Sequence, residues 1–213
     1  MASPTGTPLL VAIHRIAMRA SLLFDRLRTA VYYRALFGAV GRGTIVQPPV
    51  LLANPHRIFL GNGVLIRRGA RLEVIEAGGA TPILSIGSNT NLEQNVHIVC
   101  RQRITIGDNV SITANCAIVD VTHAFDGLPE GAKIGEQIDG GPSFVEIGDG
   151  AFLGIGTVVL PNVRIGRRAV IGANSVVTHS IPDFACAAGA PARVLRVYRT
   201  PDQSRQLVFD GRG

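Results

Sequence analysis

Residues 147–178 read IGDGAFLGIGTVVLPNVRIGRRAVIGANSVVT, and an aliphatic residue returns at every sixth position. These aliphatic residues are Ile147, Leu153, Val159, Ile165, Ile171 and Val177. A small or β-branched residue stands four positions after each of the first five, at Ala151, Thr157, Val163, Ala169 and Ser175. A period of six fits neither the helical repeat of about 3.6 residues nor the alternation of a flat strand. It predicts a β-helix, in which each six-residue unit forms a short strand and a corner and three units complete a turn.

The same register is visible over much of the upstream chain. Its aliphatic positions are Leu60, Ile66 and Leu72, then Ile86, Leu92 and Ile98, then Ile106, Ile112 and Ile118. The register breaks at 77–85, where we expect a small outward loop, slips by two residues at 101–103 and is lost after His123. We therefore expect an all-β solenoid of about five to six coils with one long loop at 124–144. A loop of this length in a regular solenoid is usually functional.

Residues 9–37 contain no Gly or Pro and are rich in Leu, Ile, Ala and Arg, which predicts a helix. In a helical projection Arg15, Arg19 and Arg26 share one side, and the other side is apolar. The apolar residues are Ile13, Ile16, Ala20, Leu23, Phe24, Leu27 and Val31. The charges interrupt the apolar run before it reaches the length of about 18 residues that a membrane span needs. We expect either a helix that caps or flanks the solenoid or peripheral contact of residues 9–37 with an anionic membrane.

The composition fits a narrow solenoid in a reducing compartment. Apolar residues are 46% and aromatic residues 5% of the chain, so the interior suits Ile, Val and Leu better than rings. Cys100, Cys116 and Cys186 form an odd set without close spacing, which supports neither a disulfide framework nor a zinc knuckle. No small-residue cleavage site follows a compact apolar core near the N-terminus, which argues against a signal peptide. We therefore predict a cytoplasmic protein.

Charge is distributed unevenly along the chain. The net charge is +6, and residues 1–71 hold ten Arg against one acidic residue, Asp25. We divide the chain into a basic amphipathic helical region at 1–43, a β-helix domain at 44–198 and a polar tail at 199–213. Nucleic-acid binding is not predicted, because aromatic residues suited to base stacking are few.

The ladder, its IGDN-type corners and the segment GAPARVLR at 189–196 resemble the hexapeptide-repeat acyltransferases. Within that family the resemblance is closest to sugar O-acetyltransferases of the maltose and galactoside type and to polysaccharide-modifying relatives, and it covers about residues 60–196. It implies a left-handed parallel β-helix and a homotrimer whose active sites lie between subunits. It also implies transfer of an acyl group from acetyl-CoA to a hydroxyl of a sugar, polysaccharide or glycolipid precursor.

The resemblance makes His123 the catalytic candidate, because family members carry their histidine at the junction with the loop. An alcohol is un-ionised near neutral pH, so its attack on a thioester needs a base, and imidazole titrates in that range. The resulting imidazolium can return the proton to the departing sulfur. No paired Cys or Ser nucleophile is evident, so we expect direct transfer without a covalent acyl-enzyme.

Four further residues are candidates for acceptor binding. His97 comes directly before an inward aliphatic, so it should face out of the coil, one turn before His123. Glu93 also points outward, where relatives carry a polar residue that contacts the acceptor. Arg101 stands where the maltose and galactoside enzymes have an acidic acceptor ligand, and this departure leaves the identity of the sugar open. Asp120 is a polar neighbour of His123, with a corner role as the alternative.

In family members the pantetheine arm of CoA runs in a groove between adjacent subunits and contacts backbone amides of the C-terminal coils. The positions of this sequence that match are Gly154, Ile155, Ala173, Thr178, His179, Arg193 and Arg196. Arginines beside the phosphorylated adenosine would donate charge-assisted hydrogen bonds. Relatives commonly carry Lys at the position of His179. For the glycines, β-helix corners are the alternative to ligand contact.

Two other kinds of protein remain as alternatives. The first is a non-catalytic β-helix scaffold or membrane-associated binding module. The second is a metalloenzyme like the γ-class carbonic anhydrases, which needs three histidines, two of them five residues apart. Ile118 and Leu128 occupy the positions five residues from His123, so we expect no metal.

Overall fold

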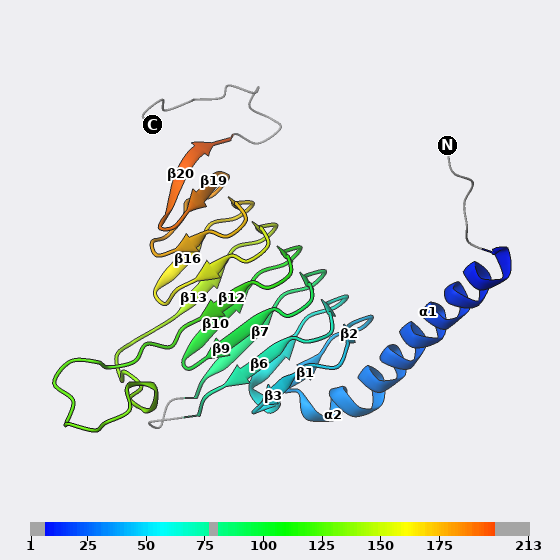
Figure 1. Cartoon of the computed structure of the whole chain (residues 1–213), viewed down its shortest axis with the longest axis horizontal. Coiled ribbons are helices and arrows are strands. Elements are labelled where there is room, and N and C mark those ends of the chain that lie inside the picture. Colours follow the sequence, from blue (N-terminus) through cyan, green and yellow to red (C-terminus); the bar gives the residue numbers. More distant parts are fainter. Residues whose placement is uncertain (1–6, 77–80, 199–213) are drawn as a thin grey trace.

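The computed structural model describes residues 7–76 and 81–198, which form a long N-terminal helix followed by a parallel β-helix (Figure 1). The chain passes through three sheets in turn and leaves one strand in each, so the solenoid has three faces. Every pair of strands is parallel except the last, in which β20 runs antiparallel to β19. This architecture is consistent with the left-handed β-helix that the resemblance implies.

The first sheet contains β1 (Ala39–Val40), β4 (Ile58–Leu60), β7 (Ile83–Ile86), β10 (Arg103–Ile106), β13 (Val145–Ile147) and β16 (Val163–Ile165). The second contains β2 (Ile45–Val46), β5 (Leu65–Ile66), β8 (Asn91–Leu92), β11 (Ser111–Ile112), β14 (Phe152–Leu153), β17 (Val170–Ile171), β19 (Ala185–Gly189) and β20 (Ala192–Val197). The third contains β3 (Leu51–Ala53), β6 (Arg71–Val74), β9 (His97–Cys100), β12 (Ala117–Val119), β15 (Val158–Val159) and β18 (Val176–Val177). Two short 3₁₀ turns, η2 (Pro55–Arg57) and η3 (Ile134–Glu136), lie outside the sheets.

The predicted inward positions are confirmed. All six aliphatic residues of the ladder at 147–177 and their five small partners are at most 2% exposed. Each strand contributes one or two such side chains, and burying an Ile, Leu or Val stabilises the fold by about 1.5–3 kcal/mol. The core is therefore a single column of aliphatic side chains along the solenoid.

The corners explain the glycines and asparagines between the aliphatic positions. Asn115, Gly156 and Asn174 have φ of 59°, 71° and 55°, the left-handed conformation that Gly and Asn tolerate best. They lie on successive turns, and each corner bonds to the one before it, as from Gly156 N to Ala114 O at 3.0 Å and from Asn174 N to Ile155 O at 2.8 Å. Corner chemistry therefore repeats in step with the core.

Three expectations touch residues that the structure leaves undescribed. These are the start of the chain at 1–6, part of the interruption expected at 77–85, and the tail at 199–213. Residues 77–80 lie outside the described part, and β7 already begins at Ile83. The ladder therefore resumes before residue 85, earlier than the broken register suggested.

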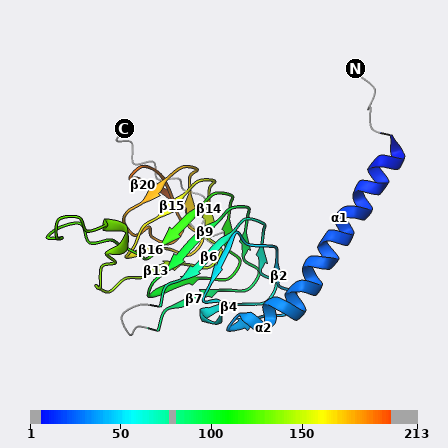
Figure 2. The same ribbon diagram turned by 60° about the horizontal axis from the view of Figure 1, so that its bottom comes forward.

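The N-terminal helix runs from α1 (Pro8–Arg28) through a π-helical turn, η1 (Thr29–Tyr33), into α2 (Arg34–Leu36). Its C-terminal half contacts the solenoid, as where Arg68 Nη2 donates to Ser21 Oγ at 3.3 Å, and Tyr33 and the following Phe37 close the N-terminal end of the core at 5% exposure each. Figures 1 and 2 show the rest of α1 projecting away from the β-helix. The C-terminal half of the helix thus caps the solenoid.

Candidate active site

A cleft of about 540 Å³ lies on the third face, beside the point where the ladder breaks. Its residues are Arg71, Glu73, Ile75, His97, Val99, Val119, Val121, His123, Gly135 and Ile138. Three neighbouring strands, β6, β9 and β12, form its floor, and the long loop that follows β12 forms its wall. Two imidazoles, one carboxylate and one guanidinium thus share an otherwise largely apolar cleft.

Strand register brings the floor residues together. Arg71 pairs with His97, and Glu73 pairs with Val99, which pairs in turn with Val119. Since side chains alternate along a strand, these residues face outward while Leu72, Ile98 and Ile118 are fully buried. The expectation that His97 faces out of the coil is met, because it lines the cleft.

The loop pairs with itself just after it leaves β12, beside this face. His123 and Ile138 form an isolated antiparallel bridge, with Ala124 N donating to Gln137 O at 2.8 Å and Asp139 N donating to Thr122 O at 2.9 Å. His123 is exposed at the mouth of the cleft. His123, from the start of the loop, and His97, from β9, therefore line the same cleft.

The surroundings of His97 favour its neutral form, chiefly through burial. Burial lowers the pKa of His97, the Arg71 guanidinium lowers it further, and the Glu73 carboxylate opposes part of that effect. Arg71 Nε donates to Glu73 Oε2 at 3.0 Å, so the two charges largely compensate each other. A neutral imidazole accepts a hydrogen bond or a proton, and the floor of the cleft supplies one beside His123.

Asp120 and Arg101 lie outside the cleft lining and fasten the base of the loop. The fully buried Asp120 carboxylate accepts from Arg101 N, from Gln102 N at 2.8 Å and from Arg103 N at 2.7 Å. Arg101 Nη1 donates to Gly141 O at 2.7 Å, and Ser143 Oγ donates to the Asp120 carbonyl. The slip of the register at 101–103 is therefore a turn held by Asp120, which favours the corner role.

Glu93 lies away from the cleft. It follows β8, at the edge between the second and third faces, and its Oε2 lies 2.6 Å from Arg67 Nε.

Arg71 and Glu73 line the cleft but were not singled out in the sequence. The alternation of outward and inward residues in β6 predicts that both side chains face outward. It does not predict which residues of the next turn pair with them.

The predicted donor residues separate into two groups. Gly154, Ile155 and Ala173 lie in turns between the second and third faces, where a Cβ on Gly154 would meet Ala173 N at 2.6 Å. Stacking of the turns thus explains this glycine without a ligand. Arg193 and Arg196 are exposed on β20, which extends the second face at the C-terminal end.

The second group lies on another edge. Thr178 and His179 follow β18 at the edge between the third and first faces, the edge from which the long loop also departs. Their side chains bond to each other, with Thr178 Oγ1 2.8 Å from His179 Nδ1. A single chain therefore presents the predicted donor residues on opposite sides of its third face.

Neither interior cysteine has the properties of a nucleophile. Burial raises the pKa of the Cys100 thiol to about 12 and also raises the pKa of Cys116. Cys116 Sγ contacts Gly154 O at 3.2 Å inside the coil, as expected for an inward small residue. Over residues 7–76 and 81–198, no three His, Cys, Asp or Glu side chains are grouped to hold a metal ion.

Comparisons with known proteins agree with this geometry. Residues 144–179 match the family model described as bacterial transferase hexapeptide (six repeats). The chain is 30% identical over 186 residues to WbbJ of Escherichia coli K12, named for O-acetyl transfer in lipopolysaccharide biosynthesis, with 83% of this chain and 87% of WbbJ covered. It is 33% identical to the galactoside O-acetyltransferase of the same strain, covering 80% of this chain and 68% of that enzyme.

A solved structure shows the same fold. The hexapeptide-repeat containing acetyltransferase VCA0836 from Vibrio cholerae superposes with a TM-score of 0.54 at 25% identity, covering 90% of this chain and 94% of that one. The chain therefore belongs to the hexapeptide-repeat acetyltransferase family. It is an acyltransferase, as the sequence predicts, and the expected co-substrate, acetyl-CoA, is bound in a second VCA0836 structure.

Proposed function

We propose that this protein transfers an acetyl group from acetyl-CoA to a hydroxyl of a sugar in a polysaccharide or glycolipid precursor, with His123 as general base. The observation that carries the proposal is the cleft whose lining combines His123 at the start of the loop with His97 of β9 and with Arg71 and Glu73 of β6. WbbJ and the galactoside enzyme, both named O-acetyltransferases, support a sugar hydroxyl as acceptor.

The proposed reaction is a direct displacement. His123 takes the proton of the acceptor hydroxyl as its oxygen bonds to the thioester carbonyl carbon, and the carbon–sulfur bond then breaks. The imidazolium returns the proton to the sulfur, so the products are the acetyl ester and free CoA thiol. Neutral His97 accepts a hydrogen bond from a second hydroxyl of the sugar, which holds the acceptor beside His123. The raised pKa values of Cys100 and Cys116 disfavour a thiol acyl-enzyme.

We further propose that the active enzyme is a homotrimer. The residues predicted to bind CoA occupy two different edges of one chain, so an arm touching both groups needs the edge of a second copy. Phe152, at 42% exposure, and the outward Val158, Val170 and Val176 give the second and third faces an apolar surface suited to such contact.

The test is acetyl-CoA turnover, read as free thiol, against a panel of sugars, nucleotide-sugars and glycolipids. We expect His123→Ala to lower kcat about 10² to 10⁴-fold while calorimetry shows nearly unchanged CoA affinity. His56→Ala removes an exposed histidine that pairs with Glu76 and serves as the matched control. Near-normal turnover of His123→Ala would assign the base elsewhere.

His97 is the second candidate for the base, because its imidazole is neutral and lies in the same cleft. If His97 only positions the acceptor, His97→Gln should raise KM for the acceptor about tenfold and change kcat less. If His97→Gln instead lowers only kcat and shifts the pH profile, His97 would be the base and His123 would position the acceptor. Absence of CoA binding by the wild-type protein would instead favour a non-catalytic scaffold.

A further inference from the structure

The N-terminal helix, made of α1 and the following turn η1, exposes most of its apolar side chains. From Leu9 to Val31, seven large apolar residues follow one side of it, and each is more than half exposed. They are Leu9 at 70%, Ile13 at 51%, Ile16 at 67%, Leu23 at 67%, Phe24 at 61%, Leu27 at 60% and Val31 at 68%. We call these seven residues the apolar stripe. At a rise of about 1.5 Å per residue the stripe is roughly 30 Å long.

The apolar stripe points away from the solenoid. The opposite side of the helix makes the contact with the first turn, where Asp25 and Thr29 are 1% and 2% exposed. Gln47 Nε2 donates to Asp25 Oδ2 at 3.0 Å, and Val46 N donates to Thr29 Oγ1 at 2.9 Å. These buried bonds fix the rotation of the helix, so the stripe cannot turn inward without breaking them.

One flank of the stripe is basic. Arg15, Arg19 and Arg26 fall within about 40° of one another in a helical projection. None of the three forms a salt bridge within the described residues, whereas Arg28 pairs with the buried Asp25. A helix with an apolar stripe and a row of unpaired cations has the pattern of helices that lie in a membrane interface.

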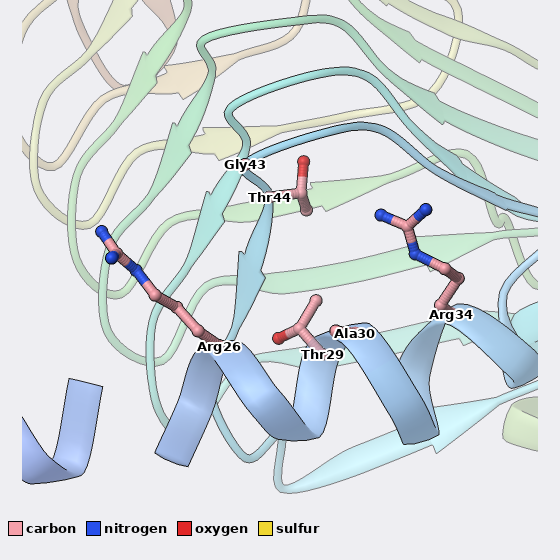
Figure 3. Close-up of a pocket in the computed structure, with 6 residues that line it drawn as sticks. All are labelled: Arg26, Thr29, Ala30, Arg34, Gly43 and Thr44. Carbon is pink, nitrogen blue, oxygen red and sulfur yellow. The ribbon is translucent and has the colours of Figure 1, made fainter. Parts of the chain in front are cut away.

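The basic row continues into a hollow at the base of the helix. Figure 3 shows Arg26 and Arg34 on either side of Gly43 and Thr44. The cavity between them is about 420 Å³ and is also lined by Thr29 and Ala30. Arg34 has one long contact there, from Nη2 to Gly41 O at 3.5 Å. Two guanidinium groups at one opening attract an anionic oxygen, such as that of a phosphate.

A second copy of this helix is a poor occupant for the stripe. The first 71 residues carry ten Arg and only Asp25 as an acid, and Asp25 is buried and paired. Helices packed stripe to stripe would bring basic flanks together without acidic partners, which destabilises the pair. An anionic lipid surface satisfies both the apolar stripe and the arginines.

We propose that residues 8–31 bind the surface of an anionic phospholipid bilayer, with the apolar stripe in the acyl boundary and Arg15, Arg19 and Arg26 at the phosphates. The helix then lies between the bilayer and the solenoid. No helix among the described residues is long and apolar enough to cross a membrane, which agrees with a helix that lies on the surface. The inference does not depend on the proposed reaction.

The experiment is sedimentation of the full chain with vesicles of phosphatidylcholine, with and without phosphatidylglycerol. We expect binding only to the anionic vesicles, weakening as salt rises. Arg15→Gln/Arg19→Gln/Arg26→Gln should bind them about a hundredfold more weakly, because each cation near such a surface contributes about fivefold. The control removes three solenoid arginines, as Arg57→Gln/Arg164→Gln/Arg167→Gln, and should bind as wild type does.

A second pair of variants tests the side of the helix that binds. Ile16→Gln/Leu23→Gln, on the stripe, should lose at least about tenfold in binding. Met18→Gln/Leu22→Gln, on the opposite side of the helix from the stripe, removes apolar residues that are 59% and 40% exposed and should change binding less than twofold. Equal losses in both variants would overturn the proposed orientation.

Two further outcomes would overturn the proposal itself. The first is absence of wild-type binding to anionic vesicles at low salt. The second is a combined result, in which the wild type does not bind vesicles and the oligomer of a stripe variant dissociates in gel filtration. That result would mean that the stripe contacts a second copy of the chain. Thiol release by the same samples reports the proposed acetyl transfer separately, so either idea can fail without the other.

Discussion

The ladder at 144–178 and the loop before it use their backbone hydrogen bonds differently. In the ladder each turn bonds to the next, as from Gly148 N to Ile165 O and from Gly166 N to Ile181 O, both at 2.8 Å. The loop bonds mainly to itself and to the turn at its base, and Phe125 and Ile134 are 78% and 52% exposed. The ladder therefore holds the structure together, and the loop is free to place reactive side chains.

The largest expected effect on stability comes from truncating a buried side chain of the ladder. Leu153 is fully buried, so Leu153→Ala should cost about 2–5 kcal/mol of unfolding free energy through lost burial and a cavity. In the loop, Phe125→Ala should cost less than about 0.5 kcal/mol, because its ring is 78% exposed. Urea unfolding of the two variants measures the contrast. Comparable losses would mean that the loop is part of the cooperative core.

The anchor between the two regions should give the next effect. Asp120→Ala removes an acceptor for three backbone N–H groups, which we expect to cost about 3 kcal/mol and to loosen the loop. Asp120→Asn keeps an acceptor of the same shape and should recover part of that stability. Amide hydrogen exchange at residues 101–103 and 120–143 would locate the change. Unchanged protection in Asp120→Ala would show that the anchor is unimportant.

Substitution of one glycine in the ladder and one in the loop should have opposite effects on stability. A Cβ at Gly148 would meet Arg167 N at 2.6 Å, so Gly148→Ala should cost about 1–3 kcal/mol by overpacking. Nothing lies within 4 Å of a Cβ at Gly140 in the loop, and its φ is not positive, so Gly140→Ala should stabilise by about 0.4–1 kcal/mol. Thermal unfolding checks both signs. A stabilising Gly148→Ala would contradict the close stacking.

The smallest expected effect concerns His97, where the ladder meets the loop. Its pKa is lower in the folded protein than in the unfolded chain, so the unfolded chain takes up the proton more readily. The contribution of His97 to the free energy of unfolding is therefore fully present above about pH 6.5 and is lost as the pH falls below that value. In urea unfolding between pH 8 and about pH 5.5, the free energy of unfolding of His97→Gln should change less with pH than that of the wild type. The same slope in both proteins would remove His97 as its source.

The sequence predicted the scaffold well because the six-residue period is a local property. Whether Ile165 or Ala169 points inward depends only on its place in its own strand and corner. The helix at 9–37 was predicted for a similar reason, since propensity and apolar periodicity act over a few neighbouring residues. The structure adds where this helix contacts the solenoid and that its stripe faces outward.

The site was less predictable. His123 was identifiable from its place at the break, and His97 from its outward register. Arg71 and Glu73 were missed because their position opposite His97 and Val99 depends on the length of the turn between them, which an insertion changes. Asp120 and Arg101 were predicted to bind the acceptor, with a corner role as the alternative for Asp120, and in the structure their side chains bond at the base of the loop.

The sequence by itself determined the β-helix, its inward column and the position of its largest interruption, because burial repeats with a fixed local period. Only the tertiary structure decided which outward residues share the cleft and which way the basic helix faces. Those outcomes depend on register between turns of unequal length and on buried bonds such as those of Asp25, Thr29 and Asp120. Contacts between distant segments leave no periodic signal in the residues that make them.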